Sequence, residues 1–385
     1  MKMDAKEKAL EISKQLGGKI EVTSKVSINS MEDLAIAYTP GVAAVSAEIA
    51  KDKEKAYTYT SKKNLVAVVT DGSAVLGLGN IGPEAAIPVM EGKAALFKRF
   101  AGVDAVPLSL DTQDVDEIVA HVKAIAPSFG GINLEDISAP RCFEIERRLK
   151  EELDIPVFHD DQHGTAIVVL AATINALKLA DKEISKVKIV INGAGAAGIA
   201  IAKKLLLAGA ENLLLVDQKG IIASNDLQID DRHIEIAEMT NQKNIQGDLK
   251  KALEEADLFI GVSAPNVLKK DWIKSMNQKP IIFAMANPQP EIDPAEAKEA
   301  GAYIVGTGRS DFPNQINNVL AFPGIFRGAL DARARDITDS MQLAAAKGIA
   351  QAIPDNELTT ENIIPNVFDE QVVEIVAKSV MEAAD

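Results

Sequence analysis

The sequence predicts an α/β protein of two domains, the first an α/β domain and the second built on a parallel sheet. The chain has 385 residues, more than one ordinary hydrophobic core organises. Short runs rich in valine, isoleucine and leucine alternate with helical stretches of about ten to fifteen residues, which is the pattern of βαβ units. A glycine-rich turn separates a strand-like run from a helix in the second half. We therefore expect one domain at 1–162 and another at 163–385.

The first domain is expected to begin with helices and then alternate strands with helices. A helix at 3–16 ends at two glycines, and a Pro-Gly turn precedes a helix around 42–51. The apolar run at 65–70 is the first strand, and a glycine-rich loop at 76–83 leads into a helix at 84–100. The later expected elements are strand 104–110, helix 114–126, strand 131–134, helix 140–152 and strand 156–158.

The second domain follows a long apolar helix at 163–180. Its first strand, 187–192, is expected to be buried because most of its residues are apolar, and the glycine-rich turn follows it directly. The other expected elements are helix 199–208, strands 213–217, 258–262, 281–285 and 303–307, and helices 338–352 and 369–383.

Composition and charge exclude several classes of protein. The chain is 47% hydrophobic and 25% charged, as in a folded rather than a disordered protein. A net charge of −15 argues against nucleic acid or an anionic membrane as a partner. A single cysteine, Cys142, cannot form an internal disulfide, and we find neither a secretory segment nor the roughly 20 apolar residues of a membrane span. We expect a cytoplasmic protein.

Two pairs of acids follow two neighbouring strands of the first domain. They are Glu135, Asp136, Asp160 and Asp161. Either pair alone would more often be solvated loop acids or helix caps. Two pairs at equivalent strand ends repel each other unless a cation joins them. Oxygen ligands without cysteine suit Mg²⁺ or Mn²⁺, and we expect His159 and His163 to lie outside the ligand set.

The glycine-rich turn of the second domain predicts a bound dinucleotide. Its sequence is Gly193-Ala194-Gly195-Ala196-Ala197-Gly198. The motif alone is weak, but here it lies between a strand and a helix, and Asp217 ends the next strand. The helix amino terminus would hold the pyrophosphate, and Asp217 would bind the ribose hydroxyls and repel a 2′-phosphate. We therefore expect a Rossmann-like domain that prefers NAD to NADP, a preference that Lys219 could soften.

Two further residues become candidates for a functional role only when they are considered together with these motifs. Tyr38 lies beside the Pro-Gly turn and Lys93 lies in the interior of the helix at 84–100. In isolation, such a tyrosine usually packs against its neighbours, and such a lysine usually reaches the solvent along an apolar surface.

Taken together, the sequence resembles malic enzymes of the compact bacterial type over nearly its whole length. The matching segments are Tyr38-Thr39-Pro40-Gly41-Val42-Ala43, Thr70-Asp71-Gly72, Leu76-Gly77-Leu78-Gly79, Gly92-Lys93, Leu134-Glu135-Asp136, His159 to Ala166, Ala286-Asn287-Pro288 and Asn317-Asn318-Val319. In that family L-malate is oxidised by hydride transfer to a nicotinamide and then loses carbon dioxide to give pyruvate.

The resemblance implies a role for each matching residue. Glu135, Asp136 and Asp161 would ligate the metal, and Asn287 and Asn318 would contact the substrate carboxylates, with Asn287 also near the cofactor. Lys93 would take the proton from the malate hydroxyl, Tyr38 would help to protonate the enol, and Asp160 would tune the lysine. Such a base needs a pKa below the usual ~10.4 of lysine, which nearby metal charge and a partly dry cleft would provide. The resemblance also implies a homodimer with contacts from the amino-terminal domain.

One departure and three alternatives accompany this interpretation. Larger members carry a substrate-binding arginine where this chain has Ala74, so the group that neutralises the second malate carboxylate is not identified. An oxaloacetate decarboxylase or a malolactic enzyme would use the same site. A two-domain dehydrogenase for amino acids would not explain the paired acids, and an NAD-binding sensor without activity would not need them.

Overall fold

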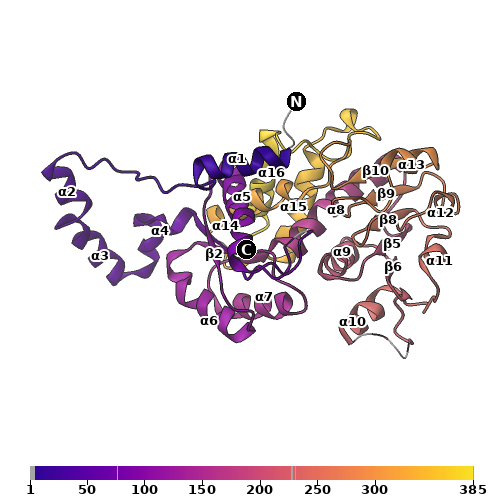
Figure 1. The fold of residues 1–385 in the computed structure, drawn as a ribbon, viewed down its shortest axis with the longest axis horizontal. Coiled ribbons are helices and arrows are strands. Elements are labelled where there is room, and N and C mark those ends of the chain that lie inside the picture. The colour runs from indigo at the N-terminus through magenta and orange to yellow at the C-terminus, as the bar shows by residue number, and fades with distance from the viewer. Residues whose placement is uncertain (1–4, 76, 227–228, 230, 385) are drawn as a thin grey trace.

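Two β-sheets flanked by helices form the body of the protein, as the sequence predicts (Figure 1). The computed structural model describes residues 5–75, 77–226, 229 and 231–384. The predicted helix start at residues 3 and 4 and residue 76 of the glycine-rich loop therefore lie outside the described residues.

The first sheet has four parallel strands in the order β2-β1-β3-β4. The strands are β1 (Leu65–Thr70), β2 (Asp104–Ser109), β3 (Gly131–Leu134) and β4 (Val157–His159). Its connecting helices are α5 (Pro83–Ala101), α6 (Val115–Ile125) and α7 (Arg141–Glu152). Because β1 and β3 lie at the centre and are buried on both faces, neither alternates apolar with polar residues; β1 is a continuous apolar run up to Thr70, and β3 includes the buried Asn133.

The second sheet has six strands in the order β10-β9-β8-β5-β6-β7. Its parallel strands are β5 (Lys188–Asn192), β6 (Asn212–Asp217), β8 (Leu258–Gly261), β9 (Ile281–Ala284) and β10 (Ile304–Thr307). The short β7 (Gly220–Ile221) pairs antiparallel with β6, so the sheet is mixed at one edge. Two residues are too few to show a periodic pattern, which is why the sequence did not reveal β7.

Short helices connect the strands of the second sheet. They are α9 (Ala196–Leu207), α10 (Asp231–Thr240), α11 (Leu249–Leu253), α12 (Lys270–Ile273) and α13 (Pro294–Glu299). Single 3₁₀ turns occur elsewhere, at η1 (Lys53–Lys55), η2 (Ser61–Asn64), η3 (Ala126–Ser128), η4 (Asn318–Leu320) and η5 (Asp355–Glu357).

Helix α8 (Asp160–Ala180) joins the two halves of the molecule. It is long and apolar enough to cross a membrane by composition alone, but 72% of its most apolar window is buried inside the protein, as in a core helix. One hydrophobic cluster runs from Val66 of β1 through α8 to Ile189 of β5. Because the core is continuous, the domain boundary expected after residue 162 stays a prediction.

The carboxyl-terminal helices return to the first sheet. They are α14 (Phe322–Ala332), α15 (Asp339–Gln351) and α16 (Glu370–Glu382). The rings of Phe322 and Phe326 pack edge-on against Phe97 of α5, with centroids 4.8 and 5.2 Å away. Helix α14 is not among the predicted helices. Its glycines lie against α16 where a side chain would not fit, as Gly328 does.

The amino-terminal helices include an arm that extends away from the body (Figure 1). Helix α1 (Ala5–Leu16) lies near α5 and α16, whereas α2 (Met31–Ala37) and α3 (Gly41–Lys51) lie at the far end of the arm, and α4 (Ala56–Tyr59) leads back. None of these four helices contains a buried residue among those the structure describes.

Candidate active site

The two acid pairs meet at the carboxyl edge of the first sheet. Strands β3 and β4 pair in parallel with Leu134 opposite His159, so the acids that follow both strands leave the sheet side by side. Glu135, Asp136 and Asp160 are buried and Asp161 is half-buried. The backbone N–H of Asp136 donates to Asp161 Oδ2 at 2.8 Å, which ties one pair to the other.

Lys93 of α5 reaches into this cluster and is only 7% exposed. Its Nζ lies 2.9 Å from Glu135 Oε1 and 2.5 Å from Asp160 Oδ2, and 4.0 Å from the centre of the Phe322 ring. Asn318 of η4 also donates to Asp160 Oδ2, at 2.5 Å. The lysine, both of its carboxylate partners and one of the predicted substrate-binding amides are therefore brought together from four separate segments.

The two carboxylate partners of Lys93 dominate its electrostatics. Burial lowers the pKa of Lys93, but the charges of Asp160 and Glu135 raise it by more, so the pKa lies above its ordinary value. The lowered pKa that we expected was for Lys93 beside a bound metal, and that expectation stays a prediction. Two carboxylates in hydrogen-bond contact favour the ammonium form more strongly than a dry environment disfavours it.

Negative charge exceeds positive charge in the cluster. Burial raises the pKa of Asp160 to about 6, and burial likewise raises the pKa of Glu135 despite its contact with Lys93. The pKa of Asp161 is raised to about 6, chiefly by the loss of solvent around its carboxylate. One lysine therefore does not neutralise the acids around it, and a further cation would stabilise their ionised forms.

The carboxylate oxygens and the negative charge of these acids suit a hard dication. The side chains are not, however, arranged as a complete coordination sphere. Within the described ranges, no three histidine, cysteine, aspartate or glutamate side chains are arranged to hold a metal. Glu135 faces Lys93 and Asn133, and Asp160 Oδ1 is buried without a hydrogen-bond partner. A buried carboxylate oxygen without a partner, beside acids of raised pKa, fits a site that gains its ion together with a small change of rotamers.

A cavity of about 540 Å³ opens beside the acids, between the two sheets. The predicted site residues that line it are Asp136, Asp161, Ala196, Ala197, Asn287 and Asn318. Among the residues described here, no arginine lines it; the guanidinium of Arg141 pairs instead with the buried Asp71 at 3.1 Å. The cavity thus joins the acid cluster to the turn predicted to bind the dinucleotide.

The glycine-rich turn has the close approaches that the sequence predicts. A Cβ on Gly193, whose φ is 124°, would overlap the Val262 carbonyl, and a Cβ on Gly198 would overlap the Gly193 carbonyl oxygen. Gly195 faces open space and is the amino-terminal cap of α9 without a side-chain hydrogen bond. The turn therefore leaves backbone N–H groups of α9 exposed to the cavity, as an anion site requires.

Asp217 ends β6 as expected, and its carboxylate also accepts hydrogen bonds from the backbone of the turn that follows. Its Oδ1 accepts hydrogen bonds from the backbone of Lys219 at 2.7 Å and Gly220 at 3.1 Å. It borders a small hollow that His233 also lines, apart from the main cavity. The ribose contact predicted for Asp217 would use its remaining acceptor capacity.

Tyr38 is not part of the cavity of its own chain. It is the carboxyl-terminal cap of α2, a helix of the extended arm (Figure 1), and its side chain is 66% exposed. The structure therefore brings Lys93, the acids and both asparagines together, but it does not bring Tyr38 to them within one chain.

Two buried glutamates near the cavity escaped the sequence reasoning. Glu291 is fully buried and accepts the backbone N–H groups of Ser263 and Ala286, both at 3.0 Å, at the cavity wall. Glu146 of α7 is also buried, in contact with His159 and His163. Glu146 lies on the buried side of α7 and Glu291 precedes α13, and neither position can be distinguished from an exposed glutamate in the sequence alone.

The fold and the site define a class, a two-domain α/β enzyme with a dinucleotide turn on one sheet and a lysine–carboxylate cluster on the other. Residues 17–150 match the malic enzyme N-terminal domain, and residues 162–385 match the malic enzyme NAD binding domain. The chain therefore belongs to the malic enzyme family.

Relatives and solved structures agree with this assignment. The NAD-dependent malic enzyme of Geobacillus stearothermophilus is 60% identical over 96% of this chain and 77% of its own length. The bifunctional malic/malolactic enzyme of Bacillus subtilis (strain 168) is 57% identical over 99% of this chain and 93% of its own. The crystal structure of the NAD-dependent malic enzyme from Thermotoga maritima superposes with a TM-score of 0.94 at 55% identity, covering 98% and 99% of the two chains.

Proposed function

We propose that this protein catalyses the oxidative decarboxylation of L-malate to pyruvate and carbon dioxide, with reduction of NAD. The contact of one buried lysine with two carboxylates, beside a cavity bordered by the dinucleotide turn, carries this proposal. Such a site joins a group that can exchange a proton with a substrate hydroxyl to a place for the nicotinamide that accepts the hydride.

Substrate binding, proton abstraction and protonation of the enol would be carried out by different residues of the chain. Asn287 and Asn318 border the cavity and would bind the malate carboxylates through their amides. Lys93 would accept the proton of the C2 hydroxyl as hydride leaves C2, and Asp160, held by Asn318, would keep the lysine in place. After the β-carboxylate leaves as carbon dioxide, the enol of pyruvate needs a proton at C3, which Tyr38 would help to supply.

We propose Glu135, Asp136 and Asp161 as the ligands of Mg²⁺ or Mn²⁺. A bound dication would supply positive charge that lowers the pKa of the malate hydroxyl and of Lys93 and stabilises the enolate oxygen. The excess of buried carboxylates over cationic groups in the site supports this proposal.

NAD is the proposed cofactor, with NADP a weaker substrate. Asp217 stands at the end of β6, where a carboxylate would repel a 2′-phosphate. The relative from Geobacillus stearothermophilus is named NAD-dependent, whereas a 47% identical relative from Escherichia coli is named NADP-dependent. The ratio of kcat/KM for the two nucleotides tests this preference, and a higher value with NADP would contradict it.

The reaction itself is tested by incubating the protein with L-malate, NAD and Mn²⁺ and quantifying NADH, pyruvate and lactate. We expect NADH and pyruvate in equal amounts, and no turnover after a chelator has removed the ion. Lactate without net NADH would instead support malolactic activity, which the name of the Bacillus subtilis relative makes the second candidate. If the protein turned over oxaloacetate but not L-malate, it would be an oxaloacetate decarboxylase instead.

We further propose that the enzyme is a homodimer and that Tyr38 acts in the site of the partner. The arm carries apolar side chains that its own chain does not cover: Val26 is 58% exposed, Met31 81% and Ile36 69%. A surface of this kind is typical of a protein interface. A second copy would cover it and would also supply the tyrosine that the cavity of one chain does not contain.

Mixing two inactive variants tests the shared site. If Tyr38 acts across the interface, a heterodimer of Lys93→Ala and Tyr38→Phe chains has one site with both residues intact and one with neither. Random re-association of equal amounts would then restore about a quarter of wild-type activity, because half of the dimers are mixed and each has one working site. No restoration after confirmed subunit exchange would mean that Tyr38 acts within its own chain or not at all.

A further inference from the structure

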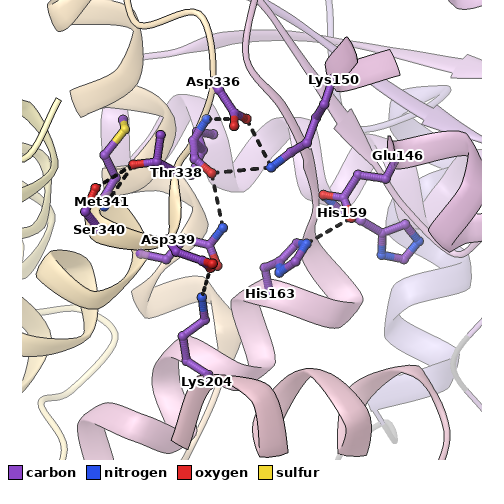
Figure 2. Close-up of polar contacts among 12 residues, drawn as sticks. Glu146, Lys150, His159, His163, Lys204, Asp336, Thr338, Asp339, Ser340 and Met341 are labelled. Carbon is purple, nitrogen blue, oxygen red and sulfur yellow. Dashed lines mark hydrogen bonds and ion pairs between the residues drawn. The ribbon is translucent and has the colours of Figure 1, made fainter. Parts of the chain in front are cut away.

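Glu146 is a buried carboxylate with no place in the chemistry described above. It lies on α7, outside the main cavity, and is 6% exposed. Figure 2 shows it beside His159 and His163, which come from the junction of β4 and α8. A buried ionised group is costly unless its neighbours satisfy it, so its contacts reveal what it does.

The carboxylate spans the first turn of α8. Its Oε1 accepts the backbone N–H of His159 at 3.2 Å, and its Oε2 accepts the Nε2–H of His163 at 2.9 Å (Figure 2). These two residues are one helical turn apart and enclose Asp160 and Asp161. The amino-terminal cap of α8, His159, makes no side-chain capping hydrogen bond, so Glu146 provides the negative group that such a helix end favours.

The charge of Glu146 is maintained by the same contacts. Burial raises the pKa of this carboxyl, but His163, with smaller contributions from Lys150 and His159, lowers it by more, to about 2. An ionised acceptor holds both donors at once, whereas a protonated one would lose an acceptor. The orientation of the first turn, and with it the direction of the aspartates, therefore depends on Glu146.

We propose that Glu146 is a positioning residue that fixes the first turn of α8 and thereby presents Asp161 for binding of the divalent cation. This inference rests on the proposed metal site. A leucine of similar size could fill the space between α7 and α8, but it could not hold the backbone of His159 and the ring of His163 together. Partners of this kind, behind the ligands themselves, commonly govern metal affinity by about ten- to a hundredfold.

The test measures Mn²⁺ binding by the loss of the free-ion paramagnetic resonance signal, without any turnover, and NAD binding in parallel. In Glu146→Ala we expect the dissociation constant for Mn²⁺ to rise by about ten- to a hundredfold, with NAD affinity unchanged. Glu146→Gln should weaken Mn²⁺ binding less, because its amide oxygen can still accept the His159 N–H. Glu144→Ala, an exposed change on the same helix whose carboxylate lies 3.8 Å from Arg148, is the matched control and should bind both ligands normally.

Each outcome is decisive. Wild-type affinity for Mn²⁺ in folded Glu146→Ala would overturn the inference, as would equal weakening of Mn²⁺ and NAD, which indicates a general structural defect. If the alanine variant does not fold, Glu146→Gln decides: weaker Mn²⁺ binding with normal NAD binding supports the inference, and wild-type binding of both overturns it. Wild-type protein that binds no Mn²⁺ would refute the proposed metal site itself, before any variant is compared.

Discussion

Replacing Lys93 perturbs stability and catalysis for different reasons, and the two effects can be separated. Its ammonium contacts Glu135 at 2.9 Å and Asp160 at 2.5 Å in a site that is nearly closed to solvent. Removing one partner of a buried ion pair costs about 3–5 kcal/mol, because the remaining charges stay buried. Loss of a general base lowers kcat by about two to four powers of ten, or roughly 3–5 kcal/mol of transition-state stabilisation.

Three variants distinguish these effects. Lys93→Ala should lower both kcat and the free energy of unfolding. Lys93→Arg keeps the charge, but a guanidinium does not give up its proton near neutral pH, so kcat should fall as far while most of the stability remains. A small primary amine added to Lys93→Ala should restore part of kcat, because it can occupy the vacated space and act as the base.

The assay is the steady-state rate with L-malate, NAD and Mn²⁺, accompanied by urea unfolding and by NAD titration of each variant. NAD affinity should change little, because Lys93 lies outside the dinucleotide turn. Folded Lys93→Ala with kcat within tenfold of wild type would refute the assignment of Lys93 as the base.

Three further predictions concern other parts of the molecule. Gly198→Ala should abolish NAD binding, measured by nucleotide fluorescence, because the added methyl would overlap the Gly193 carbonyl; wild-type affinity would show that the turn is not needed in this shape. The pKa of Glu146 is lowered from 4.5 to about 2, so its ionised form stabilises the fold above about pH 4.5 by at most about 3 kcal/mol, and this contribution is lost as the pH falls toward 2. The difference in unfolding free energy between wild type and Glu146→Gln should therefore be larger at pH 7 than at pH 3, and a constant difference would contradict the contact with His163. Burial raises the pKa of Cys142 to about 12, so thiol reagents at neutral pH should modify this residue only as fast as the protein opens; rapid labelling of native protein would show that it is accessible.

The fold was predictable from the sequence wherever a local pattern specifies the structure. The apolar strands and the turn at Gly193–Gly198 are such cases, because periodicity and glycine spacing act over a few residues. Helix α14 was not predictable, because its glycines serve contact with a distant helix rather than a local turn. The same limit applies to Gly164: a side chain there would overlap the Asp160 carboxylate, which only the folded helix reveals.

The candidate site was predictable as a set of residues but not as an arrangement. The acid pairs and Lys93 follow from strand ends and from family resemblance, and the structure brings them together. The raised pKa of Lys93 depends on its contacts with Asp160 and Glu135, which no spacing in the sequence reveals. Tyr38 and Glu146 depend on elements far apart in the chain, or on a second copy, so their positions had to come from the three-dimensional structure.

The most direct test of the whole account is to locate the dication. Crystals grown with Mn²⁺ and NADH would give an anomalous difference peak at the ion. We predict one strong peak bound by carboxylate oxygens of Glu135, Asp136 and Asp161, with the ammonium of Lys93 turned toward the cavity. A peak bound elsewhere, or no peak at saturating Mn²⁺, would contradict it.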